Sequence, residues 1–214
     1  MPGPHGMPPD SDYIHRFAPP ATPGGPVILA LHGTGGDEND LLPLVKMIDP
    51  DAGILSPRGN VLEQGMPRFF RRIAEGVFDL EDLRRRTAQL GAFLEDAAAR
   101  YGFEASRLYA LGYSNGANIA ASLLLSTPGA LAGAMLLRAM VPFEPDALPD
   151  LTGVPVLISA GREDSMIPQA QTKRLADLLS EAGADVTLSW IEAGHGLVRR
   201  EIDEAARWFS GRPA

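Results

Sequence analysis

The segment that most constrains the fold is the pentapeptide G-Y-S-N-G from Gly112 to Gly116. A short apolar strand is predicted before it, over 106–112, and a helix rich in Ala, Leu and Ile after it, over 115–126. A G-x-S-x-G turn at such a junction holds the serine in a strained, exposed position, and glycines flank it because a side chain would crowd the approach of strand and helix. The order strand, turn, helix therefore indicates that Ser114 is a nucleophile.

A serine hydroxyl attacks a carbonyl only when a base removes its proton, so Ser114 requires a histidine and a group that orients it. The chain has four histidines. In the order serine, acid, histidine that is typical of this motif, the base follows the serine, and His195 alone does so. It lies in A-G-H-G after a predicted strand over 186–191. We therefore expect His195 to be the base, on a loop at the end of that strand.

The orienting carboxylate is expected between Ser114 and His195, on a loop that follows another strand. The continuous apolar run V-P-V-L-I-S-A over 154–160 is typical of a strand buried on both faces. Glu163 and Asp164 lie in the loop after it. We select Asp164 to hold the imidazole in its productive tautomer, and Glu163 remains the competing choice.

The negative charge that develops on an attacked carbonyl requires hydrogen-bond donors. The backbone amide of Asn115 is expected to be one donor, and the other is expected from a loop after an earlier strand. The predicted strand over 27–31 is followed by the glycine-rich turn H-G-T-G-G, from which we select the amide of Thr34. A dinucleotide-binding loop is the alternative, but its fingerprint G-x-G-x-x-G fails at Glu38.

Strands that alternate with helical runs predict an α/β fold with a mainly parallel sheet covered by helices on both faces. The five expected helices span 41–47, 80–101, 115–126, 169–182 and 198–209. A chain of 214 residues with 45% hydrophobic content can bury a substantial core. We expect a single domain over residues 11–214 without a separate lid domain, and a mobile tail over residues 1–10.

Composition and charge exclude several classes of function. A net charge of −8 argues against a nucleic-acid partner, because most of the surface would repel the phosphate backbone. No apolar run follows basic residues at the N-terminus, so we expect neither secretion nor membrane insertion and predict a cytoplasmic protein. The absence of cysteine excludes disulfides and a cysteine nucleophile. The histidines have no metal-ligand spacing, so neither a metal nor another cofactor is expected.

Two segments are candidates for the walls of a substrate pocket. The first spans 57–78, and the second spans 138–143, which should emerge with Ser114 at the carboxyl edge of the sheet, where ligands bind in open parallel sheets. The selected substrate-binding residues are Met66, Phe69 and Phe70 from the first segment and Met140, Val141 and Phe143 from the second. Local packing of a proline-containing loop is the alternative for the second segment.

Arginines cluster beside the phenylalanines of the first segment. They are Arg68, Arg71, Arg72, Arg84, Arg85 and Arg86. One interpretation is a solvated helix face with ion pairs to acids such as Glu81 and Asp82. The other is that an arginine binds an anionic group of the substrate. We rank Met66, Phe69 and Phe70 above the arginines as substrate contacts.

Several segments together resemble one known family. They are L-H-G-T-G-G-D from Leu31, G-Y-S-N-G from Gly112, G-R-E-D-S-M-I-P from Gly161 and G-H-G-L from Gly194. These resemble the phospholipase/carboxylesterase family of α/β hydrolases, which includes acyl-protein thioesterases. The long segment P-R-G-N-V-L-E-Q-G-M-P-R-F-F-R-R from Pro57 is most similar to the bacterial hydroquinone-responsive carboxylesterases within that family.

The resemblance implies an α/β-hydrolase fold with a mainly parallel sheet of about seven strands. It also implies a serine esterase with the triad Ser114, Asp164 and His195, which favours Asp164 over Glu163. Thioesterase members usually have Gln and Gly after the serine, where this chain has Asn115 and Gly116. Relatives of this type often pair, so a homodimer is a candidate assembly.

The expected function is hydrolysis of a small ester, short-chain or aromatic, through an acyl-enzyme. A thioesterase or lysophospholipase acting on longer acyl chains is the alternative, since it would use the same catalytic groups. A non-catalytic ligand sensor on the same fold is a further alternative, which the intact triad argues against.

Overall fold

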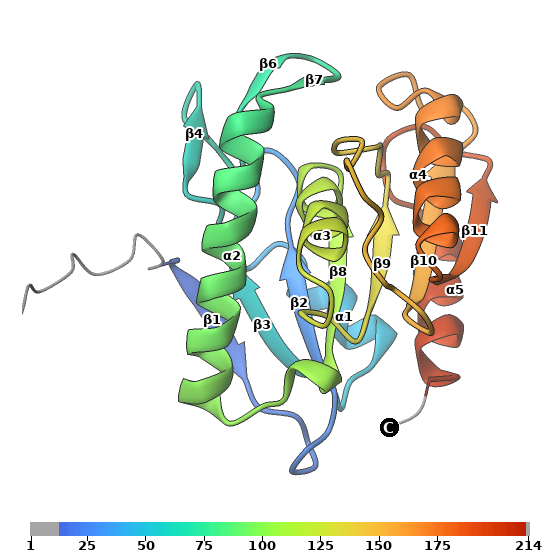
Figure 1. Cartoon of the computed structure of the whole chain (residues 1–214). Coiled ribbons are helices and arrows are strands. Elements are labelled where there is room, and N and C mark those ends of the chain that lie inside the picture. Colours follow the sequence, from blue (N-terminus) through green and yellow to red (C-terminus); the bar gives the residue numbers. More distant parts are fainter. Residues whose placement is uncertain (1–12, 213–214) are drawn as a thin grey trace, which may run out of the picture.

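The computed structural model describes residues 13–212, and the tail predicted over residues 1–10 lies outside them. One seven-stranded sheet forms the centre of the molecule (Figure 1). Its strands, in spatial order, are β1 (His15–Ala18), β3 (Gly53–Pro57), β2 (Val27–Leu31), β8 (Leu108–Tyr113), β9 (Gly133–Leu137), β10 (Pro155–Gly161) and β11 (Asp185–Ile191). β1 pairs antiparallel with β3 and all other pairs are parallel, which confirms the predicted mainly parallel sheet.

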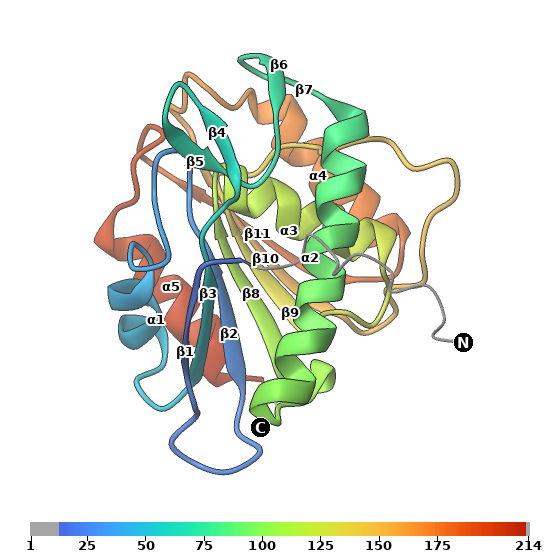
Figure 2. The same cartoon turned by 90° about the vertical axis from the view of Figure 1, so that its left-hand side faces the viewer.

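Helices cover both faces of the sheet, as predicted (Figure 2). On one face lie α2 (Leu80–Tyr101), α3 (Asn115–Ser126) and α4 (Gln169–Glu181), and on the other lie α1 (Leu42–Ile48) and α5 (Arg199–Ser210). Each bound is within one residue of the sequence prediction. None of these helices combines the length and the apolar composition that crossing a membrane requires.

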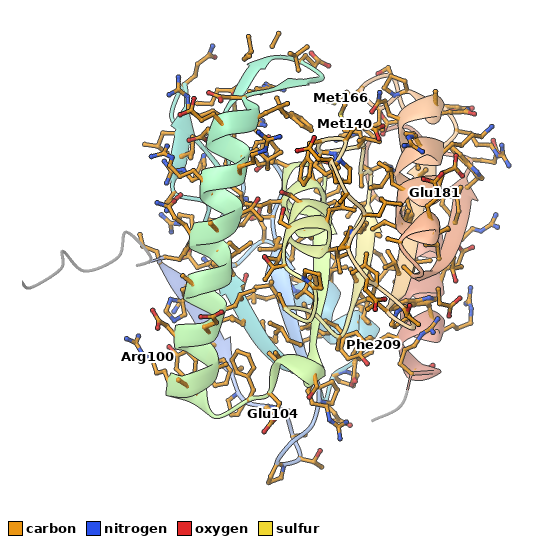
Figure 3. All side chains as sticks on the ribbon, viewed as in Figure 1. Arg100, Glu104, Met140, Met166, Glu181 and Phe209 are labelled. Atoms are coloured by element: carbon orange, nitrogen blue, oxygen red, sulfur yellow. The ribbon has the colours of Figure 1, made fainter. Side chains whose placement is uncertain are left out.

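The apolar strands are buried because each face of the sheet packs on helices. In β2 the side chains of Val27, Leu29 and Leu31 join the core beneath α2, α3 and α4. The alternate residues Ile28 and Ala30 join the core beneath α1 and α5. Side chains fill the space between the layers, and Met140 and Met166 lie at the carboxyl end of the sheet while Phe209 lies at the other end (Figure 3).

The strand order reverses between β2 and β8, and this reversal determines where a site can form. After β2 the chain moves outward through α1 to β3, whereas after β8 it moves the other way through α3 to β9. The loops after β2 and β8 therefore diverge and leave a crevice at the carboxyl edge. The glycine-rich turn after Leu31 and the pentapeptide at Gly112 to Gly116 lie in these two loops.

Two small hairpins rise above this edge, where the sequence predicts only a loop (Figure 1). The first pairs β4 (Val61–Glu63) with β5 (Met66–Arg68), and the second pairs β6 (Arg72–Ala74) with β7 (Val77–Phe78). Gln64 and Gly65, which link the strands of the first hairpin, both have positive φ, 52° and 83°. Two consecutive residues of this kind form the tight turn that matches the twist of a hairpin.

The packing of α3 against the sheet leads to a stability prediction. A Cβ at Gly116 would overlap the carbonyl of Leu31, whereas a Cβ at Gly91, inside α2, would meet Leu123 Cδ1 at 3.8 Å, an ordinary contact. We expect Gly116→Ala to lower the free energy of unfolding by about 3 kcal/mol. The control Gly91→Ala should raise it by about 0.5–1 kcal/mol, because alanine is the better helix former. Urea unfolding measures both, and a Gly116→Ala variant as stable as the wild type would contradict this packing.

Candidate active site

Ser114 lies on the sharp turn between β8 and α3, in a strained backbone conformation with φ 53° and ψ −112°. Its amide donates to the carbonyl of Leu137 at 2.8 Å, which ties the turn to β9. Glycine is required on both sides, because a Cβ at Gly112 would lie 2.6 Å from the Cα of Ala117 and one at Gly116 would overlap the carbonyl of Leu31. The close packing of strand and helix therefore holds the serine in place.

The structure brings Ser114, His195 and Asp164 into one row of hydrogen bonds. His195 Nε2 lies 3.0 Å from Ser114 Oγ, and His195 Nδ1 lies 2.8 Å from Asp164 Oδ2. With the ring proton on Nδ1, the imidazole donates to the carboxylate and accepts from the hydroxyl. Such a row can move the hydroxyl proton to the imidazole while the carboxylate stabilises the resulting cation.

The loop after β10 fixes the carboxylate of Asp164. Its Oδ1 accepts from the amides of Met166 at 2.8 Å and Ile167 at 3.1 Å, so Oδ2 faces His195. The side chain is only 1% exposed. Glu163, the competing choice, makes no hydrogen bond to His195; its amide instead donates to the carbonyl of Ala193. The geometry therefore distinguishes the two acids where the sequence alone did not.

A buried ion pair fixes the loop that carries His195. Arg138 Nη1 and Nη2 bind the carboxylate of Glu201 at 2.7 and 2.9 Å, and neither side chain is exposed. The same guanidinium donates from Nε to Gly194 O at 3.0 Å and from Nη2 to Gly196 O at 3.1 Å, on either side of His195. Sequence reasoning missed both residues, because they lie 63 positions apart and neither belongs to a motif.

Tyr113 is a further residue at the site that sequence reasoning missed, although it is a variable position of the pentapeptide. Its hydroxyl donates to the carbonyl of His195 at 3.1 Å, and its ring lies 5.5 Å from the imidazole. Burial raises the pKa of Tyr113, so the phenol stays protonated and keeps donating at neutral pH. Position 33, which faces the Tyr113 ring, has to be glycine, because a Cβ there would lie 2.9 Å from that ring.

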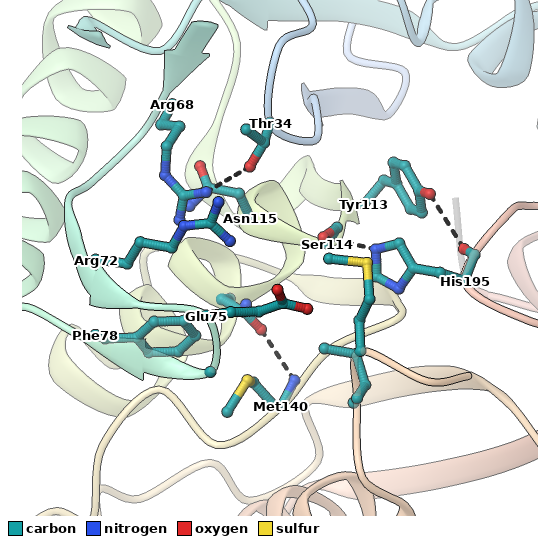
Figure 4. Close-up of a pocket in the computed structure, with 14 residues that line it drawn as sticks. Thr34, Arg68, Arg72, Glu75, Phe78, Tyr113, Ser114, Asn115, Met140 and His195 are labelled. Atoms are coloured by element: carbon teal, nitrogen blue, oxygen red, sulfur yellow. Dashed lines mark hydrogen bonds between the residues drawn. The ribbon is translucent and has the colours of Figure 1, made fainter. Parts of the chain in front are cut away.

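The amides of Thr34 and Asn115, the predicted oxyanion donors, both belong to residues that line the cavity beside Ser114 (Figure 4). Asn115 is the first residue of α3, where backbone amides have no partner within the helix. Within residues 13–212 neither amide donates a hydrogen bond. Both are therefore free to bind a developing negative charge.

Contacts from the 57–78 segment hold the Thr34 loop. The amide of Gly35 donates to Pro67 O at 2.9 Å, and Arg58 Nη2 donates to Glu38 Oε1 at 2.9 Å. His32 lies beneath the loop, with Nδ1 2.6 Å from Gly33 O. Burial lowers the pKa of His32, which keeps this ring neutral and structural.

The cavity has a volume of about 220 Å³ and opens between the hairpins and the loops after the strands (Figure 4). The residues that line it beside those already placed are Arg68, Arg72, Glu75, Gly76, Phe78, Asn118, Met140, Met166 and Ile167. Met140 therefore lies where the sequence predicts. Val141 and Phe143 line an adjacent depression instead, which shares Gly76, Phe78 and Met140 with the cavity.

The prediction that Phe69 and Phe70 form a substrate wall is wrong. Both are fully buried in the core, with the Phe69 ring 4.8 Å from His32 and the Phe70 ring 5.0 Å from Phe78. The chain turns into the core between the two hairpins, so the apolar rings pack there. Met66 is 39% exposed beside Gly35 and does not line the cavity either.

The ranking of Met66, Phe69 and Phe70 above the arginines is also wrong, because Arg68 and Arg72 line the cavity and those three do not. Arg85 and Arg86 follow the simpler interpretation of the cluster and pair with Asp82 along α2. Arg71 is 66% exposed.

Among the described residues, no three histidine or acidic side chains come together as a metal site.

Comparison with known proteins gives consistent matches along the chain. The family profile described as Phospholipase/Carboxylesterase matches residues 14–210. The putative hydrolase MhqD of Bacillus subtilis is 48% identical over 183 residues, which cover 86% of this chain and 92% of that protein. The crystal structure of a Bacillus cereus carboxylesterase is 49% identical with a TM-score of 0.89, over 91% of this chain and 92% of the other. A protein of unknown function from Agrobacterium tumefaciens is 38% identical with a TM-score of 0.86, over 96% and 98%.

The buried ion pair beneath His195 leads to a second stability prediction. Arg138→Met leaves the Glu201 carboxylate buried without its partner, so we expect a loss of about 3–5 kcal/mol in the free energy of unfolding. Adding Glu201→Gln removes the unpaired charge and should restore about half of that loss. Arg200→Met, which breaks an exposed pair with Glu204, is the control and should change stability by less than about 1 kcal/mol. A double variant no more stable than Arg138→Met would contradict the assigned ion pair.

The Glu38–Arg58 pair leads to a prediction about pH. Hydrogen bonding to Arg58 lowers the pKa of Glu38 from 4.5 to about 2. Because the folded-state pKa is depressed, the pair stabilises the fold above about pH 4.5 and loses this contribution as the pH falls towards 2. Glu38→Gln should therefore be less stable than the wild type at pH 7, with a difference that shrinks below pH 4.5 in urea unfolding. Glu95→Gln, at an exposed position, is the control. A difference in unfolding free energy between Glu38→Gln and the wild type that stays constant with pH would contradict this role of the Glu38–Arg58 pair.

Proposed function

The chain belongs to the phospholipase/carboxylesterase family of α/β hydrolases, and we propose that it is a serine carboxylesterase that hydrolyses small, short-chain or aromatic esters through an acyl-enzyme. The observation that supports this most directly is the row of hydrogen bonds through Ser114 Oγ, His195 and Asp164, with distances of 3.0 and 2.8 Å. The three groups come from loops after three different strands and meet at one edge of the sheet.

In the proposed first step, Ser114 Oγ attacks the ester carbonyl while His195 Nε2 takes the hydroxyl proton. Asp164 keeps the Nδ1 proton in place and stabilises the imidazolium. The amides of Thr34 and Asn115 donate to the oxyanion of the tetrahedral intermediate, each contributing about 3 kcal/mol to the lowering of the barrier.

The intermediate then collapses as the alkoxide leaves and takes the proton from His195 Nε2, which leaves the acyl group on Ser114. Water enters, gives a proton to His195 and attacks the acyl carbonyl. The second tetrahedral intermediate releases the carboxylic acid and returns the proton to Ser114 Oγ. The Arg138 contacts to Gly194 and Gly196 keep the imidazole within reach of Ser114 during both steps.

The dimensions of the cavity favour small substrates. Its volume of about 220 Å³ lies below the range of about 300–1,000 Å³ that drug-sized ligands occupy. Phe78, Met140 and Ile167 give it apolar walls on which a short acyl or aromatic group can pack. A longer acyl chain would have to extend into the adjacent depression that Met140, Val141 and Phe143 line. The thioesterase and lysophospholipase alternative requires this longer binding path.

Hydrolysis of 4-nitrophenyl acetate, butyrate and palmitate by the purified protein tests this proposal. We expect kcat/KM for acetate and butyrate to exceed that for palmitate by about tenfold or more, since the cavity is short. Ser114→Ala should lower kcat by about 10⁴-fold or more, because it removes the nucleophile. The control Ser126→Ala, at the exposed far end of α3, should leave turnover unchanged.

Other outcomes would favour the alternatives. Preference for palmitate would indicate an enzyme for long acyl chains. A wild type that binds esters but hydrolyses none would indicate a ligand sensor and contradict the proposed esterase.

A further inference from the structure

One wall of the cavity carries hydrogen-bond donors that have no acceptor in the described part of the chain. Arg68 is 3% exposed, donates from Nε to Phe70 O at 3.1 Å and from Nη1 to Thr34 Oγ1 at 2.6 Å. Arg72 binds Glu63 through Nε and Nη2. Within residues 13–212, Arg68 Nη2 and Arg72 Nη1 donate no hydrogen bond. Both residues line the cavity, so these nitrogens are available to a ligand there.

Asn115 lies behind this wall. Its Oδ1 accepts from the amide of Phe69 at 2.8 Å, which fixes the orientation of the side-chain amide and ties the 57–78 segment to the start of α3. Its Nδ2 is itself buried and has no hydrogen-bond partner among residues 13–212, so the donors that a ligand in the cavity can reach are those of the two arginines.

Two guanidinium groups of this wall share one carboxylate. Within residues 13–212, Glu63 is the one acid within ion-pair distance of Arg68 and Arg72, at 3.3 and 2.7 Å. Burial and the neighbouring Arg72 together lower the pKa of Arg68 more than Glu63 raises it. Glu75 also lines the cavity, but it is exposed on the turn of the second hairpin and pairs with neither arginine.

The wall lies on the side of the cavity opposite His195. Figure 4 shows Arg68, Arg72 and Asn115 grouped at one end, His195 at the other and Ser114 between them. The hydrogen bond from Arg68 to Thr34 Oγ1 joins this group to the loop that supplies the proposed oxyanion amide. A substrate with its carbonyl at Ser114 would therefore extend one of its two ends toward the arginines.

We propose that Arg68 and Arg72 form a subsite for a carboxylate of the substrate, so that the preferred esters are anionic. This inference rests on the proposed esterase function and defines its substrate class. The carboxylate accepts hydrogen bonds from Arg68 Nη2 and Arg72 Nη1, and it balances the second guanidinium. It belongs either to the acyl part, as in monoesters of dicarboxylic acids, or to the leaving group, as in acylated hydroxy acids.

Matched pairs of esters test the subsite, because each pair replaces a carboxylate by a carboxamide of the same shape. Monoethyl succinate and ethyl succinamate test the acyl side, and 4-acetoxybenzoate and 4-acetoxybenzamide test the leaving-group side. We expect kcat/KM for the acid to exceed that for the amide by about tenfold or more in one pair, since charge-assisted hydrogen bonds are the strong ones. The pair that responds identifies the part of the substrate that binds the wall.

The variant Arg72→Gln keeps a polar side chain but removes the charge. It should reduce the preference for the acid to within about threefold, mainly through a higher KM for the acid. Arg72→Lys should retain part of the preference. Arg71→Gln is the matched control, because it makes the same change in net charge at an adjacent residue that is 66% exposed and does not line the cavity.

Binding to the Ser114→Ala protein gives a readout that does not need turnover. In calorimetric titrations of this variant, the preferred acid should bind about tenfold more tightly than its amide, and added Arg72→Gln should abolish the difference. Equal kcat/KM for acid and amide in both pairs would overturn the subsite and leave the esterase function standing. An equal loss of the preference for the acid over the amide in Arg71→Gln and Arg72→Gln would also overturn the subsite. Hydrolysis of no ester would instead contradict the esterase function, and the titrations would then decide the subsite alone.

Discussion

The close packing of α3 against β2 and β8 is the constraint on which the rest of the site depends. Gly112 and Gly116 let the helix approach the strands more closely than any side chain would permit. This approach forces Ser114 into a positive φ and directs its hydroxyl toward His195. It also begins α3 at Asn115, whose amide remains free beside that hydroxyl. The strained serine is therefore a consequence of helix packing, and the same packing supplies a donor for the proposed oxyanion.

The groups around the serine are held by backbone and buried contacts in addition to their hydrogen bonds with one another. Asp164 is fixed by two amides of its own loop, and the loop of His195 is fixed by Arg138 and Glu201. Such support keeps the imidazole and carboxylate oriented before a substrate arrives, which is the condition for efficient proton transfer. On the opposite wall, Arg68 and Arg72 share the carboxylate of Glu63, and this is the basis of the proposed subsite.

Much of the fold could be predicted from sequence because local patterns determine it. The long amphipathic or apolar runs give the five helices within one residue, and the buried strands β2, β8, β10 and β11 were also predicted. The edge strand β1, its neighbour β3 and the two hairpins were not predicted, since they are short and depend on pairing. Sequence-based prediction meets the same limit at Arg68 and Phe69 of the site. Adjacent residues of an irregular segment face the core or the cavity according to tertiary packing, and Arg138 meets Glu201 only in the folded chain.

The central claim is that His195 activates the Ser114 hydroxyl. Labelling with a fluorophosphonate, followed by peptide mapping, tests this most directly because the reagent reports the nucleophile without any assumption about substrate. We expect a single adduct on Ser114 that forms rapidly in the wild type and about 10³-fold or more slowly in His195→Ala. An adduct on another residue, or a labelling rate at Ser114 that does not depend on His195, would contradict it.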